Sequence, residues 1–267
     1  MKIIVFSDVH YFSADMETAI FNKTEKRVEY SLPMLDEITE KANTDPKADL
    51  AVNLGDLIQD TTEHDGDIKA LGFMFERLKR IKCPCYSILG NHDLKMMDSV
   101  EEVEKLLGYK STYSLNKGGW HLVFLTTEVR PELGTGRGGC YKAQYLSDEH
   151  LKWLAEDLSK NTLPCLIFTH YALAEDESVS DECMFMKNRA SVKEIINSNK
   201  NVKAVFSGHL HKSDMITENG IPYYLVGSPI ADLKHLGRPD GAYVEINLDG
   251  EEVRVTEHFI KADGLSL

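Results

Sequence analysis

Five short apolar segments of this chain each run into a turn rich in aspartate, asparagine or histidine. The segments have the length and the bounding polar or glycine residues of buried strands. They are 3–6, 50–54, 86–89, 166–168 and 202–206. The turns that follow hold Asp8 and His10, Gly55 and Asp56, Gly90 to Asp93, His170, and Gly208 to His211. Loop residues at the carboxyl ends of buried strands converge at one edge of a sheet, so we expect one shared pocket.

Helical patterns separate these strands, which indicates an α/β fold. Apolar residues recur at helical spacing in five stretches, 34–42, 68–78, 100–106, 151–158 and 192–196. Ser31 and Ser147 stand where the caps of the first and fourth helices are expected.

The last part of the chain changes to short strand-like runs. These runs, at 213–217, 221–226, 242–247 and 252–259, are separated by turn residues and predict a β-meander. A further hairpin is expected over 113–125. This is too many strands for one open sheet in a chain of this length, so we expect two packed sheets with helices outside.

The chain of 267 residues is long enough for one large α/β domain. The motifs span residues 8 to 211, so a domain boundary between them would divide the pocket. We therefore expect a single domain over 1–267, in which the meander at 213–259 completes the second sheet.

Charge and hydropathy narrow the range of partners. The formal net charge of -13 argues against duplex nucleic acid. It leaves a small phosphate ester possible, because bound cations would decide the local charge. No apolar stretch approaches the roughly 20 residues that span a bilayer, so no membrane partner is expected. Five scattered cysteines are typical of a reducing compartment and predict a cytoplasmic protein. The pattern does not specify an oligomeric state.

The turns carry side chains of the types that bind a pair of metal ions. Four histidines, two aspartates and one asparagine offer imidazole nitrogen, which suits zinc, iron and nickel, and oxygen, which suits manganese. Two such ions roughly 4 Å apart can bind phosphoryl oxygens and lower the pKa of a shared water. The expected cofactors are therefore two ions from among Mn, Fe, Zn and Ni. Each residue alone could instead be an ordinary turn or cap residue.

The five motifs resemble those of the calcineurin-like metallophosphoesterase superfamily. Its pattern is D-x-H, G-D, G-N-H-D or G-N-H-E, H and G-H-x-H, and every part is present in order over residues 8 to 211. The resemblance implies a four-layer α/β/β/α sandwich, in which two mixed β-sheets are flanked by helices and a dimetal site lies at the carboxyl ends of the strands. It places one metal on Asp8, His10, Asp56 and His211 and the second on Asp56, Asn91, His170 and His209, so that Asp56 bridges the two.

The same resemblance gives His92 a role toward the substrate. His92 would stabilise the phosphoryl charge or protonate the leaving oxygen, and Asp93 would fix its orientation. The combination of His10 with G-N-H-D is most similar to small cyclic-nucleotide and glycerophospho-diesterases. Thr61 and Gln59 depart from the patterns of phosphoprotein phosphatases and purple acid phosphatases, respectively.

The expected function is hydrolysis of a small phosphodiester or nucleotide phosphoester by a hydroxide that two metals activate. The alternatives are a phosphomonoesterase of broad specificity, a nuclease, and a metal-binding scaffold or sensor with the same fold. Arg130, Arg137 and Lys142 are candidates for binding the part of the substrate that does not react. Long irregular segments at 11–30, 126–146 and 171–187 are where we expect substrate selection to reside.

Overall fold

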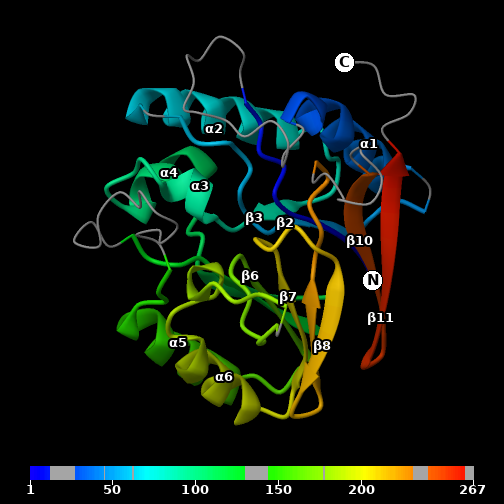
Figure 1. Cartoon of the computed structure of the whole chain (residues 1–267). Helices are drawn as coiled ribbons and strands as arrows, with labels where there is room; N and C mark the ends of the chain where they lie inside the picture. The colour runs from blue at the N-terminus through cyan, green and yellow to red at the C-terminus, as the bar shows by residue number, and fades with distance from the viewer. Residues whose placement is uncertain are drawn as a thin grey trace.

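The computed structural model describes residues 1–12, 28–44, 46–61, 63–129, 144–176, 178–230 and 240–261. Within these ranges the chain forms two β-sheets with helices on their outer faces (Figure 1). The first sheet has the strand order β11-β10-β1-β2-β3 and the second β4-β5-β6-β7-β9-β8. Parallel and antiparallel pairs occur in both sheets, so both are mixed, as expected.

The strands of the first sheet are β1 (Lys2–Phe6), β2 (Leu50–Asn53), β3 (Cys85–Ser87), β10 (Asp240–Asp249) and β11 (Glu252–Lys261). Those of the second sheet are β4 (Tyr113–Lys117), β5 (Trp120–Leu125), β6 (Cys165–Thr169), β7 (Val202–Ser207), β8 (Asp214–Glu218) and β9 (Ile221–Leu225). The α-helices are α1 (Ser31–Asn43), α2 (His64–Leu78), α3 (Asn91–Leu94), α4 (Val100–Leu107), α5 (Asp148–Lys160) and α6 (Arg189–Asn197). The described ranges also include the short 3-10 helices η1 (Val28–Tyr30) and η3 (Glu182–Met184).

The alternation of side chains along β1 shows how the layers arise. Ile4 and Phe6 pack into a core formed with α1 and α2, whereas Ile3 and Val5 pack into a second core between the two sheets. Phe124 of β5 contributes to that second core from the opposite sheet. A third core lies between the second sheet and α5 and α6. The four-layer α/β/β/α sandwich is therefore confirmed, and Figure 1 shows α1 and α2 on the opposite side of the sheets from α5 and α6.

The helix caps follow the sequence prediction at one position and not at the other. Ser147 caps α5, because its side chain accepts a hydrogen bond from the amide of His150 at 3.1 Å. The prediction for Ser31 was wrong, since Tyr30 occupies the cap position of α1. The Ser31 hydroxyl instead donates to the carbonyl oxygen of His10 at 3.1 Å. Among the described residues no helix combines the length and the apolar character that a bilayer span requires.

The strands of the expected meander do not all join the second sheet: β8 and β9 belong to the second sheet, and β10 and β11 belong to the first. β8 and β9 extend the second sheet beside β7, whereas β10 crosses to the first sheet and pairs antiparallel with β1, with Ile3 opposite Ile246. The physical reason is burial: Val244, Ile246 and Leu248 of β10 face the core between the sheets. Pairing with β10 thus covers the edge of β1 and closes the core between the two sheets.

Candidate metal centre

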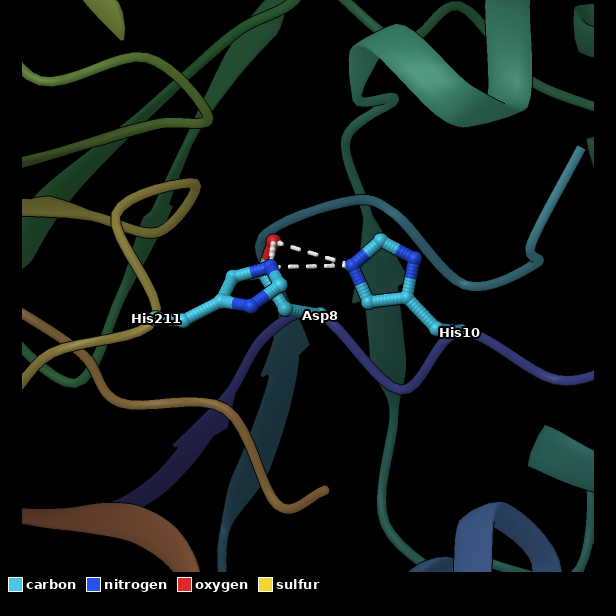
Figure 2. A group of neighbouring side chains, drawn as sticks. All are labelled: Asp8, His10 and His211. Carbon is cyan, nitrogen blue, oxygen red and sulfur yellow. Dashed lines mark hydrogen bonds and ion pairs between the residues drawn. The ribbon is translucent and has the colours of Figure 1, made fainter. Parts of the chain in front are cut away.

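The turn after β1 and the turn after β7 meet in the structure. His10 Nε2 lies 3.0 Å from His211 Nε2. Asp8 Oδ1 lies 3.3 Å from His211 Nε2 and 3.7 Å from His10 Nε2. Figure 2 shows the two imidazole rings directed toward each other, with the Asp8 oxygen beside both nitrogens. Two ring nitrogens this close cannot both carry a proton, so at least one lone pair is directed into the space between them.

A second group of expected ligands surrounds Asp56. Asp56 Oδ2 lies 3.4 Å from His170 Nε2, which in turn lies 3.1 Å from Asn91 Oδ1. His209 has a ring nitrogen within 4.8 Å of the ligand atoms of Asp56 and His170. The other ring nitrogen of His170 is 2.9 Å from the carbonyl oxygen of Leu54. Donation from Nδ1 to that carbonyl directs Nε2 into the site, where a metal ion would take the place of its proton.

Asp56 stands between these two groups. Its Oδ2 is 3.4 Å from His170 Nε2 on one side and 3.7 Å from His10 Nε2 on the other. Its Oδ1 accepts a hydrogen bond from the His92 amide at 2.8 Å, which fixes the carboxylate. One oxygen therefore faces both groups, as a bridging ligand would.

The expected ligands are buried, with one exception. Among the seven expected ligands, all but His211 are at most 6% exposed. The side chains of His211 and His92 are 20% and 11% exposed. These two imidazoles are therefore the more exposed histidines of the centre.

Backbone conformation distinguishes these residues from the rest of the chain. Five of the expected ligands have a backbone φ angle between 48° and 68°, in the left-handed region that residues with a Cβ rarely adopt. They are Asp8, His10, Asp56, His209 and His211. Asn219, in the turn between β8 and β9, is the one other non-glycine residue with positive φ within the described ranges. Strain of this kind collects at functional sites, where the surrounding structure holds it in place.

Two glycines let the backbone approach the carboxylates closely. A Cβ at Gly90 would lie 2.1 Å from Asp56 Oδ1, and a Cβ at Gly208 would lie 1.9 Å from Ser7 Oγ and 2.7 Å from Asp8 Oδ2. The amide of His209 donates to Asp8 Oδ2 at 2.9 Å. The glycines of G-N-H-D and G-H-x-H thus admit the carboxylates on which the centre is built.

The charges of the centre depend on one another. Burial alone would raise the pKa of Asp8. The His211 and His10 imidazoles lower it by more than this, so that the pKa lies well below its usual value. Burial likewise raises the pKa of Asp56, and His170 and His92 bring it below its usual range. Burial lowers the pKa of His170, while Asp56 raises it to about 9. The carboxylates are therefore held ionised beside nitrogen ligands.

The donor set fits transition-metal ions. Asp8 Oδ1 and His209 Nε2 are buried and have no hydrogen-bond partner within the described part of the chain. Leaving buried polar atoms unsatisfied costs about 1–3 kcal/mol each, and a cation would satisfy both. Imidazole, carboxylate and amide groups together suit Mn, Fe, Zn or Ni. The residues present thus agree with the metal ions expected from the sequence.

The structure corrects the partner of His92. His92 Nδ1 forms a short contact with Asp60 Oδ1, and the imidazole is not oriented by Asp93. Asp93 instead accepts hydrogen bonds from the amides of Leu57 and Ile58 with one oxygen and from the amide of Gly90 with the other. Asp93 therefore ties the turn of Asp56 to the turn of Asn91, and burial and Asp56 raise its pKa to about 7.

Two residues beside His92 were not singled out from the sequence. Asp60 contacts His92, and Lys95 donates to the other oxygen of Asp60 at 2.6 Å. The signal available was only that Asp60 follows the G-D motif by four residues and that Lys95 follows G-N-H-D by two. The proposed substrate-binding residues Arg130, Arg137 and Lys142 lie outside the described residues.

The loop after β6 is the one long loop that the structure describes almost fully. It includes η3 and a bridge between Ala172 and Phe185. Leu210, between the two histidines of G-H-x-H, packs against a small cluster that contains Ala172 and Phe185. Lys212 Nζ lies 2.6 Å from Asp176 Oδ2. The loop is thus attached to the turn that carries His209 and His211.

Comparisons with known proteins agree with this geometry. A protein of Psychrobacter sp. named "Probable cyclic nucleotide phosphodiesterase" is 23% identical over 70% of this chain and 54% of its own length. The 3',5'-cyclic adenosine monophosphate phosphodiesterase of Haemophilus influenzae is 24% identical over 92% of this chain and 81% of its own length. This chain thus spans about half the length of the first relative.

A solved structure shows the same fold. The dimetal phosphatase from Danio rerio superposes with a TM-score of 0.76 at 16% identity, covering 97% of this chain and 98% of that one. The model of the family described as calcineurin-like phosphoesterase matches residues 1–213, which include all five motifs. With this match, and with the motif residues gathered around one buried centre, the chain belongs to the calcineurin-like phosphoesterase family.

Proposed function

We propose that this chain is a metal-dependent phosphodiesterase that hydrolyses a small phosphodiester, with cyclic nucleotides as the first substrate class to test. The observation that carries the proposal is Asp56 Oδ2, which lies between a ligand group at His10 and another at His170. A dinuclear centre needs such a shared carboxylate. The names of the Psychrobacter and Haemophilus relatives support the substrate class.

In this proposal each half of the centre holds one ion. Asp8, His10, Asp56 and His211 hold the first, and Asp56, Asn91, His170 and His209 hold the second. Bound ions would bind phosphoryl oxygens and lower the pKa of a water that attacks phosphorus. The metals would be drawn from Mn, Fe, Zn and Ni, which match the mixed donor set.

The protein groups supply orientation and a proton. His92 Nε2 lies 3.9 Å from Asp56 Oδ2 in a side chain that is 11% exposed, and His92 Nδ1 is held by Asp60. We infer that Nε2 in this position is directed toward the leaving oxygen of a bound diester. General acid catalysis from such a position typically contributes about 10²–10⁴ in rate.

The two sheets and the centre between them also bear on the number of domains. We propose that residues 1–267 form one domain, because ligands from turns of both sheets share one centre and β10 returns to the first sheet after β9. A cytoplasmic location stays a prediction from the sequence, with which the free thiols of Cys83, Cys85 and Cys165 agree.

A substrate panel tests the proposal. The protein, loaded separately with manganese, zinc, iron and nickel, is assayed with bis(p-nitrophenyl) phosphate, p-nitrophenyl phosphate, 3',5'-cyclic AMP, 2',3'-cyclic AMP and glycerophosphocholine. We expect at least one metal form to hydrolyse diesters faster than the monoester. A faster monoesterase would replace this proposal with a phosphomonoesterase, and inertness of every metal-loaded form would favour a scaffold or sensor.

A further inference from the structure

A buried carboxylate connects His92 to a lysine that no motif includes. Asp60 Oδ1 contacts His92 Nδ1, and Asp60 Oδ2 accepts a hydrogen bond from Lys95 Nζ at 2.6 Å. Gln59 Nε2 donates to the same Oδ1 at 3.3 Å. Each oxygen of Asp60 is thus engaged, one on the side of the centre and one on the side of Lys95.

Asp60 is buried, whereas Lys95 is partly exposed to solvent. The side chain of Asp60 is 1% exposed, whereas that of Lys95 is 28% exposed. A carboxylate buried to this degree is costly unless opposite charge and hydrogen bonds offset the lost hydration. Lys95 supplies a full positive charge from the solvent side, which leaves Asp60 Oδ1 available to accept a hydrogen bond from His92 Nδ1.

Lys95 lies where its ammonium group can act on His92 through Asp60. Lys95 directly follows α3, the short helix that begins with Asn91 and His92. Its ammonium group is directed to the outer oxygen of Asp60, and His92 Nε2 lies on the other side of the imidazole, 3.9 Å from Asp56 Oδ2. The order Lys95, Asp60, His92, Asp56 therefore runs from the partly exposed surface to the ligands.

We propose that Lys95 is a positioning residue for hydrolysis: by holding Asp60 Oδ2, it fixes Asp60 Oδ1 against His92 Nδ1, so that Nε2 faces the leaving oxygen. This inference rests on the proposed phosphodiesterase function. Without Lys95, Asp60 Oδ2 loses this hydrogen bond, the carboxylate is freer to rotate, and the imidazole loses its fixed orientation.

The step that Lys95 supports is a proton transfer. Water adds to phosphorus, and the bond from phosphorus to the leaving oxygen breaks with its electron pair on that oxygen. The leaving oxygen takes the proton from His92 Nε2, while the attacking water gives its proton to solvent. An alkoxide is a poor leaving group and needs this proton, whereas p-nitrophenolate leaves readily without it. If Lys95 supports this proton transfer, its substitution should lower kcat more for a diester with an alkoxide leaving group than for one with p-nitrophenolate. If Lys95 only stabilises the fold, both values of kcat should fall equally.

The experiment compares two diesters on the metal-loaded full chain. One is bis(p-nitrophenyl) phosphate, and the other is the diester with an alkoxide leaving group that the unmodified protein hydrolyses fastest among cyclic AMP isomers and glycerophosphocholine. In Lys95→Met, the ratio of kcat for the alkyl diester to kcat for bis(p-nitrophenyl) phosphate should fall by about tenfold or more. Lys95→Arg should restore most of the ratio, because it keeps the charge.

Lys79→Met is the matched control. Lys79 also forms an ion pair with a carboxylate, that of Glu76, but it is 70% exposed and lies at the end of α2. The ratio should not change in this variant. Metal content of every variant is measured beside kcat, so that loss of metal is seen directly.

A double variant tests the route through Asp60. In the Asp60→Asn background, Lys95→Met should cause little further change in the ratio, because the acceptor it holds is already altered. This pair also removes the charge imbalance that could prevent Lys95→Met from folding alone. Equal loss on both diesters, loss of metal in Lys95→Met, or additive effects in the double variant would overturn the role of Lys95. An unmodified protein that hydrolyses no diester would instead overturn the proposed function, and this inference with it.

Discussion

The residues of the centre occupy backbone conformations that their neighbours must hold in place. The amides of Asp8 and His10 donate to the carbonyl oxygens of Gly55 and Asp56 at 2.9 and 3.0 Å. Ser31 and Ser228 donate to the carbonyl oxygens of His10 and Asp8 at 3.1 and 2.7 Å. Residues held in such sparsely populated regions cost about 1–3 kcal/mol each. The turn is thus fixed by hydrogen bonds, and the ligand side chains are fixed with it.

Substitution of a ligand and of His92 should have different effects. His209→Ala removes a nitrogen ligand, so we expect metal content and diesterase activity to fall together. His92→Ala should keep the metal and lower kcat by about 10²–10⁴. Metal analysis beside kinetics distinguishes the two. If His92→Ala lost metal to the same extent as His209→Ala, His92 would be a ligand and not a proton donor.

The close approach at Gly208 can be tested against a glycine with free space. Gly208→Ala places a Cβ 1.9 Å from Ser7 Oγ, so we expect a loss of roughly 1–3 kcal/mol in the free energy of unfolding, with weaker metal binding. Gly72→Ala, inside α2 with nothing within 4 Å of the added Cβ, should stabilise by up to about 1 kcal/mol. Urea unfolding and metal titration measure both. Shifts of the same sign in the two variants would contradict this account.

The expected ligand residues lie together in the structure, because the motifs that carry them follow strands that end at the same place. The motifs did not predict the partner of His92. Asp93 adjoins His92 in sequence, but its oxygens accept from the amides of Gly90, Leu57 and Ile58. Asp60 reaches His92 across 32 residues of sequence. Such a contact depends on how two turns pack, which no local pattern encodes.

At the scale of elements, the periodicity predicted strands and helices more reliably than their pairing. The runs after residue 211 are strands β8 to β11, as expected, yet they belong to two sheets. β10 pairs with β1 over Lys2 to Val5, near the opposite end of the sequence. The local pattern of β10 is compatible with pairing in either sheet. Burial of Val244 and Ile246 in the core between the sheets favours pairing in the first sheet.

The cap of α5 provides a test of local structure away from the centre. Ser147 accepts a hydrogen bond from the His150 amide, and its loss in Ser147→Ala should cost about 1 kcal/mol of unfolding free energy. Ser159→Ala, near the other end of the same helix, removes an exposed hydroxyl that donates to the Glu156 carbonyl oxygen at 2.9 Å, and it should change stability by less than about 0.5 kcal/mol. Chemical denaturation compares the two. Equal effects would show that the Ser147 hydrogen bond contributes no specific stability.

At the scale of the whole molecule, the centre joins the two sheets. Asp8, Asp56 and Asn91 follow strands of the first sheet, and His170 and His209 follow strands of the second. Both expected ligand groups draw on both sheets, so bound metal would stabilise their packing by mass action. The core between the sheets positions these turns to within hydrogen-bonding distances. The layered fold and the site are thus parts of one arrangement.

The central claim is that two ions share Asp56, and anomalous X-ray scattering from crystals of manganese-loaded protein tests it most directly. We predict two anomalous peaks roughly 4 Å apart. One should lie among Asp8, His10 and His211, the other among Asn91, His170 and His209, with Asp56 between them. A single peak, or two peaks that do not share Asp56, would contradict the dinuclear centre.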